Sequence, residues 1–264
     1  MTIPIWKTYL RRQCDYLERH KPLFHANSSD RNKVAVIVEP RKHDMLVPVI
    51  RNVMHYVGDG WNLEVVSNAA NIRHLSAELK GCTYRTLTMP YVNMSQALYN
   101  GLLLDPWFWW QLKEEHVLIF QTDCVMLRSG VDVWMPFDYV GANYFNPSHT
   151  SPKIGGIQGG FSLRKRSAML ECLEKVSWSS IQYHRTNRGL APLDCFHEDI
   201  FFTHACEILR KRVPPSDIRK LFSIEAEYHR TPIAHHGTTK NYFTEDQLLN
   251  IISQSEGYQG WSLP

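Results

Sequence analysis

One carboxylate, Asp123, interrupts a long apolar segment of the sequence. The five residues from His116 to Phe120 are almost all apolar, and apolar residues resume at Cys124. A continuous run of this kind is typical of a buried parallel strand, and open α/β sheets bind ligands just outside the carboxyl ends of such strands. Asp123 is therefore expected to face a substrate. The structural alternative is that Asp123 only caps the turn after the strand.

Two adjacent histidines, His235 and His236, lie in a segment (residues 233–240) that has the composition of a loop and ends at Lys240. Carboxylate oxygen and imidazole nitrogen both bind divalent cations, so Asp123 and this pair would together hold Mn²⁺ or Mg²⁺. Lys240 would contact a phosphate as a point charge. The alternatives are ordinary: a structural histidine and a solvated surface lysine.

A second acidic feature is the pair Glu198 and Asp199, which opens an apolar helical segment. If the fold directs one of them into the crevice that holds the metal, it could act as general base on a hydroxyl. The alternative is that both complement the dipole of a helix N-terminus. Because Phe201 stands where an H-E-x-x-H motif that begins at His197 needs its second histidine, the segment gives no support to a zinc protease.

These residues must be positioned by an α/β fold. Apolar runs alternate with helical periodicity from residue 33 onward, which predicts a mainly parallel sheet flanked by helices in one continuous domain over residues 33–264. After Asp123 the periodicity weakens. The expected strands are 34–38, 63–66, 83–87, 117–120, 137–142 and 160–163, and the expected helices are 45–56, 71–79, a stretch to 110, 167–176 and 199–209.

Residues 1–32 are expected to form a basic amphipathic helix followed by a polar linker over residues 26–32. Such a helix usually packs on its own domain; contact with a membrane surface or with a second copy is the alternative. No apolar window is long enough to span a membrane, and no signal peptide is evident. The six cysteines are dispersed without metal or disulfide spacing, which indicates free thiols and a cytoplasmic location.

Composition excludes several functions. The chain has 264 residues, and its net charge of +3 comes from scattered side chains, so no basic stripe suited to nucleic acid is present. The first strand is followed by Glu39-Pro-Arg41 instead of a glycine-rich turn, and no P-loop motif occurs, which argues against dehydrogenases and P-loop kinases. The glycine-rich residues 155–160 precede a strand, so they form either a close backbone approach to a ligand or a flexible loop.

Taken in order along the chain, short motifs resemble a family of GT-A-like glycosyltransferases with largely unassigned substrates. The resemblance covers Lys33 to Lys240, and the order of the motifs is more specific than any one of them. The motifs are residues 34–41, Gln121-Thr-Asp123, 138–142, Gly159-Gly-Phe-Ser-Leu-Arg164, His197-Glu-Asp-Ile-Phe-Phe202, Phe222-Ser-Ile-Glu225 and His235-His236.

The resemblance implies a mechanism. Asp123 stands at the last position of the D-x-D motif that holds Mn²⁺ or Mg²⁺ against a nucleotide-sugar diphosphate, and Gln121 stands where the first Asp often is. The activity implied is an inverting transfer of a sugar, with a UDP-sugar favoured as donor, to a hydroxyl of a carbohydrate or glycoconjugate. The implied roles are nucleoside contact for Glu39 and Arg41, donor binding for Gln121, Thr122, Asp123, Gly159, Gly160 and Lys240, metal binding for Asp123 with His235 or His236, and general base for Asp199 or Glu198.

Trp107 to Trp110 form an aromatic cluster that could stack on an acceptor sugar. Consecutive residues of a helix cannot all face one way, so at least one or two of the rings are expected in the core. Two alternatives to a transferase remain. A sugar-nucleotide pyrophosphorylase normally has a glycine-rich, Arg-containing loop that this chain lacks. A catalytically silent nucleotide-sugar or carbohydrate-binding module would keep the fold without turnover, and Gln121 favours it modestly.

Overall fold

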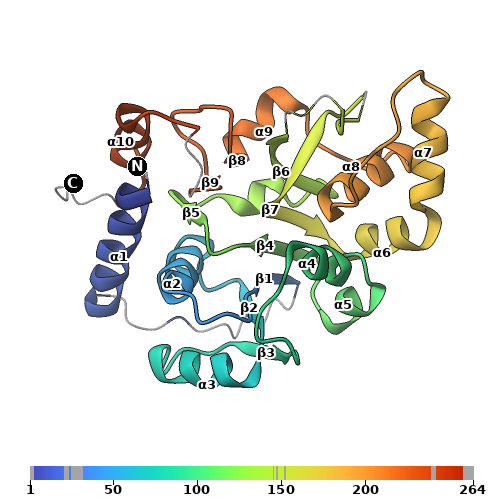
Figure 1. Cartoon of the computed structure of the whole chain (residues 1–264). Coiled ribbons are helices and arrows are strands. Elements are labelled where there is room, and N and C mark those ends of the chain that lie inside the picture. The colour runs from blue at the N-terminus through green and yellow to red at the C-terminus, as the bar shows by residue number, and fades with distance from the viewer. Residues whose placement is uncertain are drawn as a thin grey trace.

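A six-stranded sheet forms the centre of the molecule (Figure 1) in the computed structural model, which describes residues 3–20, 24, 32–144, 146, 148–151, 153–238 and 242–257. The strand order is β3-β2-β1-β4-β7-β6. The bounds are Lys33–Val38 for β1, Asn62–Ser67 for β2, Arg85–Thr88 for β3, His116–Phe120 for β4, Tyr139–Tyr144 for β6 and Gly156–Lys165 for β7.

The sheet is mainly parallel, as the sequence predicts. Strand β1 pairs in parallel with β2 and β4, and β2 pairs in parallel with β3, whereas β7 lies antiparallel between β4 and β6. From β1 the chain moves outward through β2 and β3 and then returns to place β4 on the other side of β1. The direction of winding therefore reverses between β1 and β4, and a ligand crevice is expected beyond the carboxyl ends of these two strands.

Helices cover both faces of the sheet, which explains why its central strands are apolar throughout. Alternate residues of β1 belong to two separate cores: Ala35 and Ile37 to one, Val34, Val36 and Val38 to the other. The first core includes α1 (Ile3–His20), α2 (Leu46–Val57), α3 (Ala69–Glu78) and α10 (Glu245–Ser253). The second includes α4 (Gln96–Leu103), α5 (Pro106–Gln111), α6 (Arg166–Lys175), α7 (Trp178–Thr186) and α8 (Glu198–Ile208).

A second, three-stranded sheet corrects one sequence-based expectation. Strand β9 (Ala234–His236) lies between β5 (Cys124–Met126) and β8 (Ser223–Ile224), antiparallel to the first and parallel to the second. Helix α9 (Ser216–Phe222) leads into β8. The expectation that residues 233–240 form a loop is therefore wrong over 234–236. Two histidines give no β-strand signal, and it is the pairing with β5 that makes the segment a strand.

The glycine-rich residues 155–160 are also not a flexible loop, because Gly156 to Gly160 belong to β7. A Cβ atom on Gly156 would lie 2.7 Å from the Cβ of Tyr144 and 2.8 Å from its carbonyl oxygen on the neighbouring strand. Glycine at this position allows β6 and β7 to approach closely, in the region where their register shifts between Gly141 and Asn143.

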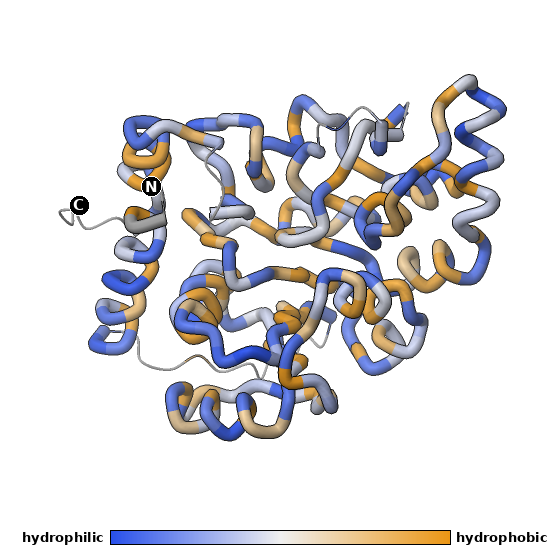
Figure 2. Tube along the Cα trace, in the orientation of Figure 1, coloured by the Kyte–Doolittle hydropathy of each residue, from blue (hydrophilic) through white to orange (hydrophobic). Residues whose placement is uncertain are grey.

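The N-terminal helix α1 is integrated into the main core. Trp6, Tyr9 and Leu10 are buried on its inner face, and the hydroxyl of Tyr9 donates a hydrogen bond to Ser255 at 3.1 Å. In Figure 2 the colour along α1 alternates between hydrophilic and hydrophobic from turn to turn. The helix thus packs on its own domain. Of the expected linker, only residue 32 lies within the described residues, and no helix in the described part of the chain is long and apolar enough to cross a membrane.

Candidate functional site

A pocket of about 790 Å³ lies beyond the carboxyl ends of β1 and β4, where the strand order predicts a ligand crevice. Its size is within the usual range for small-molecule sites. Segments far apart in the chain build its walls, from α1 to the residues that follow β9. The predicted site residues that line it are Glu39, Arg41, Gln121, Thr122, Asp123, Gly160, Glu198, Asp199 and His236.

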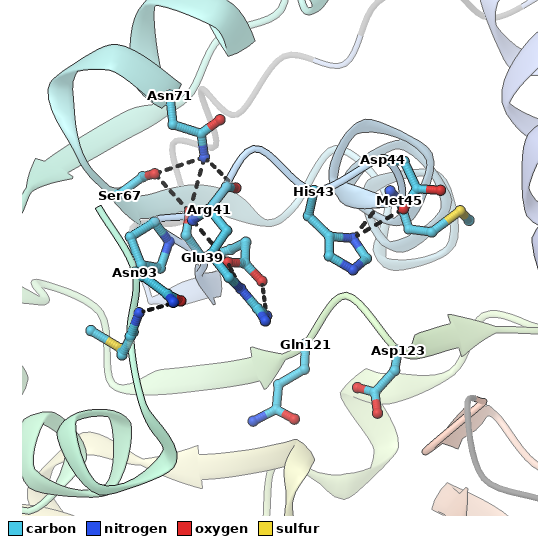
Figure 3. A network of polar contacts seen from close by, with 12 residues as sticks. Glu39, Arg41, His43, Asp44, Met45, Ser67, Asn71, Asn93, Gln121 and Asp123 are labelled. Carbon is cyan, nitrogen blue, oxygen red and sulfur yellow. Dashed lines mark hydrogen bonds and ion pairs between the residues drawn. The ribbon is translucent and has the colours of Figure 1, made fainter. Parts of the chain in front are cut away.

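Asp123 lies on the tight turn that joins β4 to β5. The turn is closed by a hydrogen bond of 3.0 Å from the Cys124 amide to the Gln121 carbonyl, and Thr238 donates its amide to the Asp123 carbonyl at 3.0 Å. Figure 3 shows the side chains of Gln121 and Asp123 projecting to the same side of this turn. The Asp123 side chain is 25% exposed, so its carboxylate is anchored by the backbone and open to the pocket.

The imidazole of His236 lies beside the Asp123 carboxylate. Its Nε2 lies 3.6 Å from the Asp123 carboxylate and 3.3 Å from the amide oxygen of Gln121. On the other side of the ring, Nδ1 lies 3.5 Å from the buried carboxylate of Glu225. A carboxylate behind a histidine fixes its tautomer and the orientation of its ring, as in many metal sites.

The donor set at this point fits a divalent cation. Asp123, Cys124 and His236 each offer a ligand atom, and these atoms lie within 4.8 Å of one another. The Cys124 thiol, however, already donates to the Gly160 carbonyl at 3.1 Å and accepts from the Gln121 amide at 3.3 Å. Asp123 and His236 are therefore the residues directed at the pocket, and they supply one hard oxygen and one nitrogen.

Gly160 on β7 makes room for His236. A Cβ atom at this position would lie 2.0 Å from Nε2 of the imidazole, far inside any van der Waals contact. The ring can occupy its place beside Asp123 only because residue 160 has no side chain. Gly160 lines the pocket, as predicted, but its role in the structure is to seat the histidine.

The neighbouring His235 lies elsewhere. Because successive residues of a strand point to opposite faces, its ring projects away from the pocket, 5.0 Å from the ring of Trp6 and 5.3 Å from that of Phe243. It belongs to neither the pocket lining nor the group around Asp123. Lys240, the predicted phosphate contact, lies outside the described residues.

Glu39 and Arg41 form a rigid pair at the end of β1 (Figure 3). The guanidinium of Arg41 donates to both carboxylate oxygens of the buried Glu39, at 2.8 and 2.7 Å. This hydrogen bonding raises the pKa of Arg41, so the side chain, which is half exposed, stays cationic. Asn71 donates to the carbonyls of Glu39 and Arg41, each at 3.0 Å, and so fixes the loop against α3.

The two adjacent carboxylates of α8 have different environments. Glu198 accepts two hydrogen bonds from the buried guanidinium of Arg164, at 2.6 and 3.0 Å. The guanidinium is itself enclosed by aromatic rings, including that of Tyr139 at 4.9 Å. The charge of Glu198 is therefore matched by a buried, bidentate ion pair with Arg164.

Asp199 is the carboxylate left available to the pocket. Its Oδ2 accepts a hydrogen bond from the Gly159 amide at 3.3 Å, and no cation is within ion-pairing distance among the described residues. Burial, together with the negative charge of Glu198, raises the pKa of Asp199 to about 7. A carboxylate with this pKa can accept a proton near neutral pH, which is the property of a general base.

Gly159 does not line the pocket but packs beneath this acidic pair. A Cβ atom there would lie 2.2 Å from the Glu198 carboxylate and 2.7 Å from the Arg164 guanidinium. Because neither glycine has a side chain, Gly159 leaves room for the Arg164–Glu198 ion pair and Gly160 leaves room for the His236 ring.

Several lining residues were not predicted from the sequence. Trp6 and Lys7 come from α1, and Tyr144 from β6. Glu225 lies within one of the motifs named above, although no role was assigned to it. Of the aromatic cluster, Phe108 and Trp109 are buried, whereas Trp107 and Trp110 are exposed on α5 and do not line the pocket.

Comparison with known proteins places most of this site in one family. A family model described as "Protein of unknown function (DUF5672)" matches residues 82–237. The match spans Asp123, Asp199 and His236, whereas Glu39, Arg41 and α1 lie before it. The comparison with curated proteins gave no match.

Proposed function

This chain belongs to the DUF5672 family, and we propose that it is a GT-A-like glycosyltransferase that moves a sugar from a nucleotide-sugar donor to a hydroxyl of a carbohydrate or glycoconjugate. One observation carries the proposal. A single pocket at the reversal point of an α/β sheet brings a metal-type pair, Asp123 and His236 at 3.6 Å, together with a carboxylate, Asp199, whose pKa is raised to about 7.

In the proposed reaction the donor would bind along the ends of β1 and β4. Arg41, fixed by Glu39, would supply a positive charge to the nucleotide, and Asp123 and His236 would hold the cation. Bound Mn²⁺ or Mg²⁺ would neutralise the diphosphate and stabilise the charge that develops on it as it leaves. Glu225 keeps the His236 ring oriented with Nε2 toward this site.

The acceptor side is the wall formed by α8 and β7. There Asp199 would take the proton of the acceptor hydroxyl while its oxygen forms a bond to the anomeric carbon. The bond from that carbon to the diphosphate breaks, and its electron pair leaves with the diphosphate. A displacement in one step inverts the anomeric configuration. Proton NMR of the product checks this, because retention would exclude Asp199 as the base of a single displacement.

The decisive experiment measures nucleoside diphosphate release from a panel of nucleotide sugars, UDP-sugars first, with an acceptor mixture and with Mn²⁺, Mg²⁺ or chelator. The native chain is compared with Asp123→Asn and Asp199→Asn, and with Asp59→Asn, an exposed turn residue, as matched control. We expect one donor to be turned over, loss of release with chelator, and a loss of about 10²-fold or more in both site variants only.

Two companion measurements separate the alternatives. Donor binding, measured by calorimetry, without release from any nucleotide sugar would favour the silent module and overturn the transferase. Nucleotide-sugar synthesis from a sugar phosphate and a nucleoside triphosphate would identify a pyrophosphorylase. Substitution of Gln121 by Asp, which would restore the usual first acid, is expected to lower the metal concentration needed for half-maximal release.

A further inference from the structure

A second group of potential ligands lies outside the pocket, on the far side of Tyr144. His149, Asp194 and Cys195 each offer one ligand atom, and the three atoms lie within 4.8 Å of one another. Nε2 of His149 is 2.8 Å from the Asp194 carboxylate and 3.6 Å from the Cys195 sulfur. We propose that these three side chains bind a zinc ion, at a site that does not depend on the proposed transferase activity.

The direction of approach distinguishes this group from a catalytic Cys-His-Asp arrangement. In such an arrangement the acid orients the imidazole through one ring nitrogen while the thiol contacts the other. Here the carboxylate and the sulfur both converge on the same nitrogen, Nε2. A nitrogen, an oxygen and a sulfur donor that lie this close together can bind the same cation.

The second nitrogen of His149 has polar partners of its own. Nδ1 lies 3.1 Å from the hydroxyl of Tyr144, which can accept its proton, as a metal-binding histidine requires when Nε2 is the ligand. The side-chain amide of Asn146 lies 3.2 Å from the same nitrogen. The ring of Tyr144 also stacks on the imidazole, with an angle of 5° between the planes. These contacts fix the ring and its orientation, which tunes a metal ligand from behind.

The backbone that carries the ligands is held by buried side chains. The guanidinium of Arg185 on α7 donates to the carbonyls on either side of His149, those of Ser148 at 2.6 Å and Thr150 at 3.0 Å. It also donates to the carbonyl of Ala191 at 2.9 Å. His204 on α8 lies 3.0 Å from the carbonyl of His149. One buried arginine thus ties together the two segments that bring the ligands to one place, so the site is preorganised.

The distances agree with tetrahedral zinc after a small adjustment. Zinc bonds of about 2.0–2.1 Å to nitrogen and about 2.3 Å to sulfur place those two ligands about 3.6 Å apart in a tetrahedron, close to the separation of Nε2 and Sγ. A nitrogen and an oxygen ligand would be about 3.3 Å apart. Asp194 would therefore move outward by about half an ångström, and its side chain, 85% exposed, is free to do so.

Zinc is favoured over magnesium because the group contains a thiol and an imidazole, which are borderline to soft ligands. Binding would release the proton of the Cys195 thiol to solvent, since the thiolate is the ligand. Three protein ligands leave a fourth position for water or an exogenous group. Because Tyr144 both lines the pocket and stacks on His149, the ion would hold one wall of the pocket in place.

The test is titration of the full chain with zinc alone, in an Asp123→Ala background that removes a ligand from the pocket group. We expect one zinc per chain, release of a proton, and, with cobalt in place of zinc, a thiolate-to-metal absorption band. Cys195→Ser should abolish the band and weaken zinc binding at least about tenfold, whereas Cys82→Ser, which leaves this group intact, should change neither.

Asp194→Asn provides a variant that should fold like the parent, because the Asp194 side chain is 85% exposed. It should weaken zinc binding with an unchanged melting curve in the presence of chelator. The proposal is overturned if the parent chain takes up no zinc, or if Cys195→Ser and Asp194→Asn bind it as tightly as the parent.

Discussion

At the scale of single residues, two glycines provide a matched test of the proposed cation site. Gly160→Ala places a Cβ atom where the His236 ring lies, whereas a Cβ on Gly101, exposed on α4, would meet nothing within 4 Å. We expect Gly160→Ala to raise the metal concentration for half-maximal activity by about 10–100-fold. Gly101→Ala should leave it unchanged and stabilise the helix by about 0.5–1 kcal/mol. Equal metal requirements in the two variants would contradict the seating role of Gly160.

If Asp199 is the general base, as proposed, its pKa sets the pH dependence of the proposed activity. A general base works only when deprotonated, and the pKa of this carboxyl is raised to about 7. Release of nucleoside diphosphate at low donor concentration should therefore rise with pH through a midpoint near 7. Asp199→Asn should abolish this rise along with most of the activity. A profile that is flat from pH 6 to 8 would remove Asp199 from the role.

The same carboxyl predicts a pH-dependent stability. Its pKa is higher in the folded chain than the ordinary value of 3.8, so the folded state holds the proton more tightly. The stabilisation is complete below about pH 4 and is lost as pH rises through about 7. Relative to the native chain, Asp199→Asn should gain up to about 4 kcal/mol in unfolding free energy between pH 4 and 8. Urea unfolding at both pH values measures the gain, and a constant difference would contradict it.

At the scale of elements, the Arg164–Glu198 ion pair attaches the N-terminus of α8 to β7. Removing one partner of a buried pair leaves an uncompensated charge, so Arg164→Met should cost about 3–5 kcal/mol in unfolding free energy. Arg164→Met combined with Glu198→Met should recover part of this loss, because both charges are then absent. Urea unfolding of Arg164→Met, Glu198→Met and the double variant measures these costs. If the cost of the double variant equals the sum of the two single costs, the pair is not energetically coupled.

The elements that could be predicted from the sequence are those whose burial is visible as a pattern of apolar residues within the element itself. Residues 34–38 and 117–120 form strands because both faces of β1 and β4 are covered, which makes a continuous apolar run. Strand β9 has three residues, two of them histidines, and exists because it pairs with β5, more than a hundred positions earlier. Helix α10 did carry a signal, the capping box of Thr244 with Gln247, although no helix was predicted there.

The site was predictable to a similar degree. Asp123 could be identified because a carboxylate at the end of a buried strand has few structural reasons to be there. The choice between His235 and His236 needed the strand, since only alternation along β9 decides which ring faces the pocket. Likewise, Glu198 and Asp199 are equivalent in the sequence, and the partner that separates them, Arg164, becomes their neighbour only in the fold.

At the scale of the whole molecule, the packing of α1 bears on the alternative that this helix contacts a membrane surface. Its apolar residues, among them Trp6 and Tyr9, are already buried against the main core. Binding to a membrane surface through this face would require the helix to detach from its domain. In a flotation assay with anionic vesicles we therefore expect the protein to stay in the dense fraction. Recovery with the vesicles, reduced by substitution of Trp6, would show that α1 does detach.

The pocket takes its walls from segments that are spread along the chain between residue 6 and residue 238. Bringing such distant parts of a chain together costs loop entropy that is recovered only when all of them are in place. Local helices can form early in folding. Asp123 and His236, however, come together only when β9 pairs with β5. The pocket is therefore expected to form late in folding, and an intact pocket indicates that the segments between residues 6 and 238 that line it have reached their native arrangement.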